Sequence, residues 1–219
     1  MQLRKLAFAL VVLAASASAH AVGFGLRVGT TGLGMDFGFG LTDSLALRVG
    51  YAGADLNRGF DEEDIHYDAK LKWSNASALL DWHFLGNFRL TGGIVNANNR
   101  VDATGTPTGG TFTINGTPYP AADVGTLTGK TRLGKSATPY LGIGYGNLGT
   151  RGFSFYADLG VMFQGAPTVS LTGTCGPALP ALQCAQLQAD IAAEEQKLND
   201  DLKDFKYYPV FNLGLAYTF

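Results

Sequence analysis

Strict alternation between apolar residues and small or charged residues is the dominant pattern of this chain. From Val22 to Val28 every second position is apolar, and the positions between are glycine or Arg27. A period of two places successive side chains on opposite faces of an extended strand. The same pattern predicts eight strands, at residues 22–31, 33–42, 44–52, 65–85, 88–95, 140–146, 153–164 and 209–219.

The two faces of these strands differ in chemistry. One face is apolar, and the other carries glycine, small residues and few charges; the chain contains 30 glycines and only 16% charged residues. A soluble β-sandwich would turn a face rich in Lys and Glu to water, and neither face of these strands is rich in them. We therefore predict an all-β fold, an eight-stranded antiparallel transmembrane barrel with lipid outside and a narrow lumen inside.

The connections between the predicted strands support this topology. The short turns fall at one end of the barrel, at residues 42–44, 86–87 and 147–150. The long loops fall at the other end, at residues 55–64, 98–132 and 173–205. Short periplasmic turns and long extracellular loops are typical of outer-membrane barrels.

Two irregular features are expected within this frame. The helical spacing of Leu187, Ile191 and Leu198 predicts an α-helix over residues 182–203, in the last extracellular loop. This helix would pack on the strand ends as a lid or bind a partner. In the fourth strand the apolar positions change phase near Ser74, which predicts a β-bulge.

The two ends of the chain indicate export to the outer membrane. Residues 1–19 have the order of a signal peptide, with a basic start, an apolar run and a small-residue cleavage site, and an alternative cleavage point follows residue 21. Residues 20–219 would then form the barrel domain. The last strand alternates and ends in Tyr217 and Phe219, which resembles the signal that the outer-membrane assembly machinery recognises.

Longer stretches resemble a narrower family. They are residues 28–34 (VGTTGLG), 45–53 (LALRVGYAG), 138–145 (TPYLGIGY) and 160–169 (GVMFQGAPTV), followed by the predicted acidic helix. In this order they resemble the small carbapenem-associated outer-membrane proteins of the CarO type. The resemblance implies an eight-stranded barrel proposed to admit ornithine and other basic amino acids. It supplies no binding motif to place on these residues.

Charged side chains on the inward parity are candidates for the functional site. They are three basic and three acidic residues, Arg27, Arg48, Arg89, Asp36, Asp81 and Asp158. They would form either an ion-pair network that stiffens the barrel or a selectivity constriction. The inward glycines would either leave a thin wet path or make room for Tyr140, Tyr156 and the stems of the arginines.

The extracellular loops are acidic, with a combined charge of −7. The acidic mouth that we predict lies in the first loop and consists of Asp55, Asp61, Glu62, Glu63 and Asp64. An acidic entrance concentrates cations, and salt screens the effect, so a channel here should prefer cations at low salt. The alternatives are a solvated surface or carboxylates that hold divalent ions beside lipopolysaccharide.

The two cysteines, Cys175 and Cys184, lie in the last loop of an exported chain, and we predict a disulfide between them. Two thiols without a nearby histidine make a poor zinc site, so no metal and no cofactor is expected. Catalysis is not expected either. Asp81, His83 and Ser77 share one inward face, but no nucleophile motif accompanies them.

The leading functional hypothesis is a narrow diffusion channel for small, cationic solutes such as basic amino acids. The alternative is a closed structural barrel whose loops serve envelope integrity, adhesion or partner binding. The expected partners are outer-membrane lipid and lipopolysaccharide, the assembly machinery and small solutes. A formal net charge of −2 gives no sign of nucleic-acid binding.

Overall fold

The computed structural model describes residues 22–62, 65–149, 151–177 and 179–219. The predicted signal peptide, with either cleavage point, lies outside these ranges and stays a prediction. Glu63 and Asp64 of the predicted acidic mouth also lie outside them. Within the described ranges no helix is both long enough and apolar enough to cross a bilayer.

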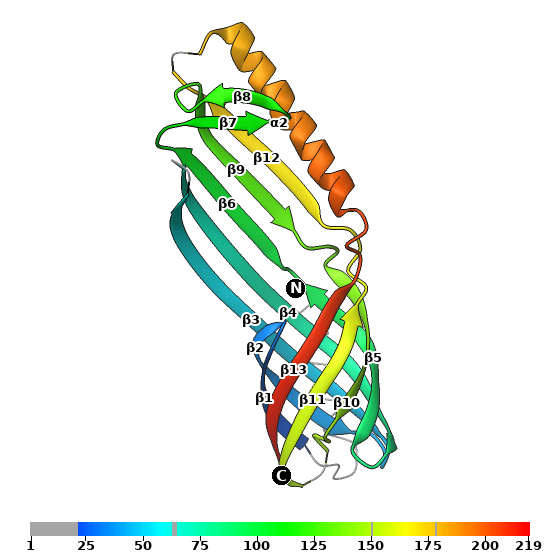
Figure 1. Ribbon diagram of the computed structural model, residues 1–219. Helices are drawn as coiled ribbons and strands as arrows, with labels where there is room; N and C mark the ends of the chain where they lie inside the picture. The colour runs from blue at the N-terminus through cyan, green and yellow to red at the C-terminus, as the bar shows by residue number, and fades with distance from the viewer. Residues whose placement is uncertain (1–21, 63–64, 150, 178) are drawn as a thin grey trace, which may run out of the picture.

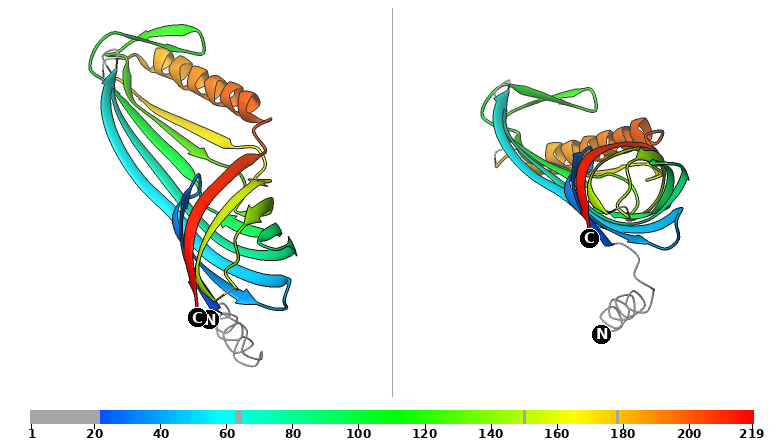
Figure 2. Two further views of the ribbon diagram at one scale, coloured as in Figure 1. Left: turned by 60° about the horizontal axis from the view of Figure 1, so that its bottom comes forward. Right: turned by 90° about the horizontal axis from the view of Figure 1, so that it is seen from below.

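Eight strands form a closed antiparallel ring at one end of the molecule (Figure 1), and the ring is seen end-on in Figure 2 (right). In ring order they are β1 (Val22–Gly29), β2 (Gly32–Gly40), β3 (Leu45–Glu62), β4 (Ile65–Leu85), β5 (Phe88–Ala97), β10 (Ala137–Tyr145), β11 (Gly152–Met162) and β13 (Tyr208–Thr218). The ladder between β1 and β13 closes the ring. Each predicted strand corresponds to one of these, so the predicted barrel is confirmed.

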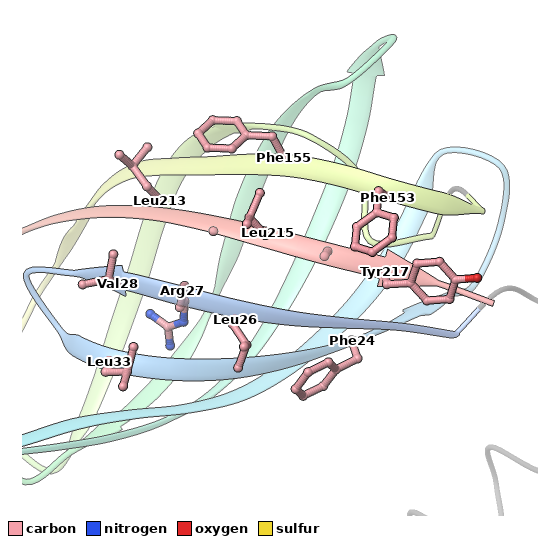
Figure 3. Close-up of a pocket in the computed structure, with 12 residues that line it drawn as sticks. Phe24, Leu26, Arg27, Val28, Leu33, Phe153, Phe155, Leu213, Leu215 and Tyr217 are labelled. Carbon is pink, nitrogen blue, oxygen red and sulfur yellow. The ribbon is translucent and has the colours of Figure 1, made fainter.

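The outer surface of the ring is apolar, as the alternation predicts. On β13 Leu213 is 37% and Leu215 is 63% exposed, whereas Gly214 between them is buried. Figure 3 shows these two leucines and Phe155 on one side of β11 and β13, where they line a shallow apolar furrow of about 530 Å³. Exposed apolar side chains of this density are suited to lipid rather than to water.

Above the ring, several strands continue as an open extracellular sheet. It consists of the upper parts of β3 and β4 together with β6 (Arg100–Pro107), β9 (Val124–Arg132) and β12 (Thr168–Cys175). β1, β2 and β13 do not continue into it, so the wall is open on one side (Figure 1). The prediction of loops at residues 55–64 and 98–132 is therefore wrong for most of their length.

Pairing with the long strand β4 explains why these segments are strands. β4 has 21 residues, which at about 3.3 Å per residue is twice what a barrel wall needs. Its later half pairs with β5 and its earlier half with β6, and the change of partner falls between Asn75 and Lys72. There the Asn99 side chain accepts a hydrogen bond from Ser74 N at 3.1 Å.

The predicted bulge near Ser74 is wrong. The β3–β4 register runs unbroken from Leu45↔Trp82 to Glu62↔Ile65, and the register shift in β4 occurs against β5, between His83 and Leu85. The phase of the apolar positions reverses for another reason. Below Ser74 the lipid-facing parity is apolar, whereas above it the opposite parity is apolar because it faces the inside of the extracellular sheet.

A helix covers the inner face of this sheet on the β12 side. α2 (Ala181–Leu202) confirms the predicted helix to within a residue at each end. Leu187 and Ile191 are buried against a small hairpin formed by β7 (Thr111–Ile114) and β8 (Thr117–Pro120). Burial and a hydrogen bond to Asp190 raise the pKa of Tyr119, on β8, to about 12. The extracellular unit therefore has a hydrophobic core of its own.

The same helix protects the free edge of β12. Glu195 accepts a hydrogen bond from Leu171 N at 2.7 Å, and Asn199 accepts one from Val169 N at 2.8 Å. Asn199 also donates to Val169 O at 2.9 Å. An uncovered edge strand offers a template for pairing with other chains, and these side chains occupy it.

A disulfide fixes the start of this helix to the end of β12. Cys175 and Cys184 are bonded, with their Cα atoms 5.7 Å apart, which confirms the predicted bridge. The two cysteines are nine positions apart in the sequence, and their bond joins α2 to the sheet that the helix covers.

Leu213→Arg should destabilise the folded barrel by roughly 2–4 kcal/mol, because it places a charge in the lipid-facing surface near the middle of the wall. The measurement is urea unfolding of the protein in lipid. Thr172→Arg is the matched control, since Thr172 lies on the outward face of β12 above the ring, and it should cost much less. Equal losses would contradict the orientation.

Glu195→Ala combined with Asn199→Ala should accelerate amide hydrogen exchange at Val169 and Leu171, because each lost hydrogen bond is worth about 1 kcal/mol. Gln196→Ala with Asp200→Ala is the control, since it removes one amide and one carboxylate from exposed positions of the same helix. If both double variants exchange alike, the two side chains do not protect the edge.

Candidate functional site in the barrel interior

Arg48 lies at the centre of a buried ion-pair network in the lumen. Its guanidinium makes two hydrogen bonds to Asp158, at 2.8 and 2.9 Å, and one to Asp81 at 3.1 Å. Arg89 shares both carboxylates, at 2.6 Å from Asp158 and 3.5 Å from Asp81. Thr91 completes the group by donating to Asp81 at 2.6 Å. Two arginines are thus held between two aspartates contributed by facing walls.

A second group adjoins the first near β1. Arg27 Nε lies 2.9 Å from Asp36 Oδ2, and the Tyr156 hydroxyl donates to the same oxygen at 2.8 Å. Arg48 reaches this carboxylate at 4.0 Å. The structure therefore joins all six predicted lumen charges into one network of equal positive and negative charge.

Several inward glycines make room for this network. A Cβ atom at Gly214 would lie 2.4 Å from the Tyr156 ring, and one at Gly142 or Gly160 would lie within 2.5 Å of the Tyr140 hydroxyl. A Cβ atom at Gly144 would lie 2.8 Å from Arg89 Cζ, so these glycines make room for both the tyrosine rings and an arginine stem.

The periplasmic end of the lumen is occupied by Leu148, from the turn between β10 and β11. This residue is 4% exposed and packs with Tyr156 and Ala216. A Cβ atom at Gly38 would lie 2.6 Å from Leu148 Cβ, so the small inward residue is what admits the turn. Sequence reasoning missed this plug, because a leucine in a short turn gives no signal of where it points.

On the extracellular side of the network the lumen contains an apolar cluster beside buried polar residues such as Thr31, Asn75 and Asn212. Leu79, Val95, Met162 and Val210 form a buried cluster with Tyr140. Between this cluster and the charges lies a cavity of about 20 Å³, room for roughly one water molecule.

The burial of the charges shows that the lumen is filled at their level. All six have an exposed fraction of 7% or less, although a side chain lining a wet pore would be accessible to water. Eight strands enclose a space that side chains can just fill, and these side chains fill it. The arrangement is that of a stiffening network rather than of a charged constriction.

The residues predicted to form an acidic mouth lie elsewhere. Asp55 and Asp61 belong to the upper part of β3, which extends away from the barrel. Asp61 is hydrogen-bonded to His66 at 2.6 Å. That hydrogen bond raises the pKa of His66. Glu62 ends β3 near the tip of the same hairpin. The described members of the group therefore run along one hairpin and do not ring the entrance.

Two of the three residues that a barrel enzyme would use make other contacts. Asp81 belongs to the ion-pair network, and Ser77 donates to Gly50 O at 3.4 Å. His83 is half-buried near the periplasmic end of β4. Among the described residues, no hydrogen bond joins any two of these three side chains.

Arg48→Met should destabilise the barrel by about 3–5 kcal/mol, because it leaves two buried carboxylates with a single arginine. Urea unfolding in lipid is the measurement, and Arg151→Met, at an exposed arginine outside the lumen, is the control. A loss no larger than that of the control would mean that the network does not stabilise the fold.

Comparison with known proteins places the fold. No protein-family model and no curated protein sequence matches the chain. Among solved structures, CarO of Acinetobacter baumannii is similar at 23% identity and a TM-score of 0.61, over 91% of this chain and 98% of that one. CarO2 of the same organism is similar at 20% identity and a TM-score of 0.60, over 93% and 100%. The chain thus has the outer-membrane β-barrel fold of the CarO structures.

Proposed function

We propose that this protein is a closed outer-membrane barrel that anchors a folded extracellular unit for contacts at the cell surface, and that it is not an enzyme. Two features support the proposal: the filled interior of the ring and the independent packing of the unit above it. The filled interior is the observation that carries it. A barrel specialised for diffusion would keep water-accessible side chains along its lumen.

The extracellular unit offers a surface for such contacts. Its inner face is covered by α2 on the β12 side, whereas an apolar strip stays open on the β3–β4 hairpin. The strip consists of Leu56, Phe60, Tyr67 and Leu71, which share one face by register. Leu56 is 55% and Phe60 46% exposed, and Phe60 stacks on Tyr67 with ring centroids 5.2 Å apart. Exposed apolar strips of this kind mark interaction surfaces.

The second candidate function is the narrow channel for small cationic solutes. The cavity of about 20 Å³ beside Arg48 and Asp158 favours it, because this cavity lies between the network and the extracellular side of the ring. Opening would require the network and the Leu148 plug to move. The two candidates therefore differ in whether current flows.

Planar-bilayer recording of the mature protein separates them. We expect no resolvable current steps from the wild type, because the lumen is filled by side chains. Tyr140→Ala combined with Tyr156→Ala and Leu148→Ala should produce steps, since it removes the plug and empties the space beside the network, which is then free to move. Wild-type steps with a cation preference that fades as salt rises would replace the proposal by the channel.

The surface role is tested with cells that display the protein. Phe60→Ser with Tyr67→Ser should reduce adhesion to an apolar surface such as polystyrene, because both changes remove the open strip. Asn57→Ser with His66→Ser alters the other face of the same hairpin and should leave adhesion unchanged. Equal adhesion of all three proteins would refute the role of the strip.

A further inference from the structure

The outward face of the extracellular sheet carries basic residues in register. Lys72 on β4, Arg100 on β6 and Arg132 on β9 lie directly opposite one another on neighbouring strands. Two residues farther from the ring, the same strands carry Lys70, Asp102 and Lys130, so that one aspartate lies between two lysines. We call the five basic residues the basic rows: Lys70, Lys72, Arg100, Lys130 and Arg132.

The basic rows lie on the face of the sheet that α2 does not cover. They share the parity of the lipid-facing residues below them, whereas α2 packs on the opposite face. Apart from Lys72, which is half-buried, all of them are exposed. Nothing in the fold thus separates their charges from what lies outside the barrel wall.

The rows are costly within the fold itself. Like charges directly opposite each other on neighbouring strands destabilise a sheet, and Arg100 has a cation on both sides. Two carboxylates offset part of this repulsion, since Asp55 lies opposite Lys72 and Asp102 lies between Lys70 and Lys130. Among the described residues, the ion pairs of the rows amount to one, between Arg100 and Asp102 at 3.7 Å. An anionic ligand would offset this repulsion.

The rows lie at a defined level above the lipid-facing surface. On β4 the last apolar outward residue is Ala76, and Tyr51 lies opposite it on β3. Lys72 follows four residues on, about 13 Å along the strand, or about 10 Å along the membrane normal for the usual tilt. The headgroup region of one leaflet is about 5–7 Å thick, so the rows lie at its outer limit, where long basic side chains can extend toward the lipid.

Hydroxyl groups complete the surface. Thr168 and Ser170 of β12 line a depression of about 560 Å³ together with three basic residues and one acidic residue, Arg100, Lys130, Arg132 and Asp102, so that the lining has a net charge of +2. Guanidinium groups bind phosphate through paired hydrogen bonds, and lysines and hydroxyls add single donors. The depression opens on the side of the sheet that continues into the lipid-facing wall.

From these observations we infer that the basic rows bind the phosphate groups of a phosphorylated glycolipid of the outer leaflet, of the lipopolysaccharide type. The acyl chains of that lipid would rest on the apolar wall directly below, and its phosphates would meet Arg100 and Arg132. The inference requires the outer-membrane barrel only and does not rest on the proposed surface role. The outward face of the extracellular sheet would then bind lipid, whereas its inward face packs against α2.

The test measures the dissociation constant for fluorescently labelled, bisphosphorylated lipid A, using the full mature protein folded in detergent micelles. Arg100→Gln combined with Arg132→Gln should weaken binding by roughly 30-fold, since each basic residue contributes about fivefold near an anionic lipid surface. Lys197→Gln combined with Lys203→Gln removes the same charge from α2 and should leave binding unchanged. Arg100→Lys with Arg132→Lys should retain most of the affinity, which separates charge from folding.

Three results would overturn the inference. Equal weakening by the two Gln pairs would mean that binding depends only on the net charge of the protein. Equal binding of lipid A stripped of its phosphates would mean that binding depends only on the apolar wall. Displacement of labelled lipid A by inorganic phosphate at comparable concentration would make the rows a site for free anions. Heat-dependent gel mobility reports in each case whether the barrel has folded.

Discussion

The bilayer allows no unpaired backbone groups in its core, and the closed ladder from β1 to β13 satisfies this constraint. Closure with eight strands leaves so little interior that every inward residue must be small or fit against its neighbours. Charges can occupy that space only when they are paired, which is why Arg48 lies between Asp81 and Asp158. The filled lumen therefore follows from the closure of the ring.

Outside the membrane the constraint is lifted, and the architecture changes accordingly. Water can satisfy open strands, so the wall continues as an incomplete sheet in which β6, β9 and β12 extend the lower strands. An open sheet has edges, and Glu195 and Asn199 of α2 occupy the one that β12 presents. The outward face of β4 changes within a few residues from apolar at Ala76 to basic at Lys72.

Local periodicity predicted the parts of the molecule that lie in lipid. A strand with one face toward lipid and the other toward a narrow lumen has a strict period of two, so the eight strands and the six inward charges could be identified from the sequence. Helical spacing was sufficient for α2, and the separation of two cysteines in one exported loop was sufficient for their disulfide. These features depend on neighbours along the chain.

The sequence by itself thus determined the ring, the orientation of its faces and the helix, whereas the tertiary structure decided what the residues do together. Only the fold showed that Arg48 bridges two walls and that Leu148 enters the lumen from a turn. Only strand pairing turned two predicted loops into a sheet and aligned Lys72, Arg100 and Arg132. The physical reason is that these contacts join strands distant in sequence, and their register is set by hydrogen bonds to β4 rather than by any local pattern.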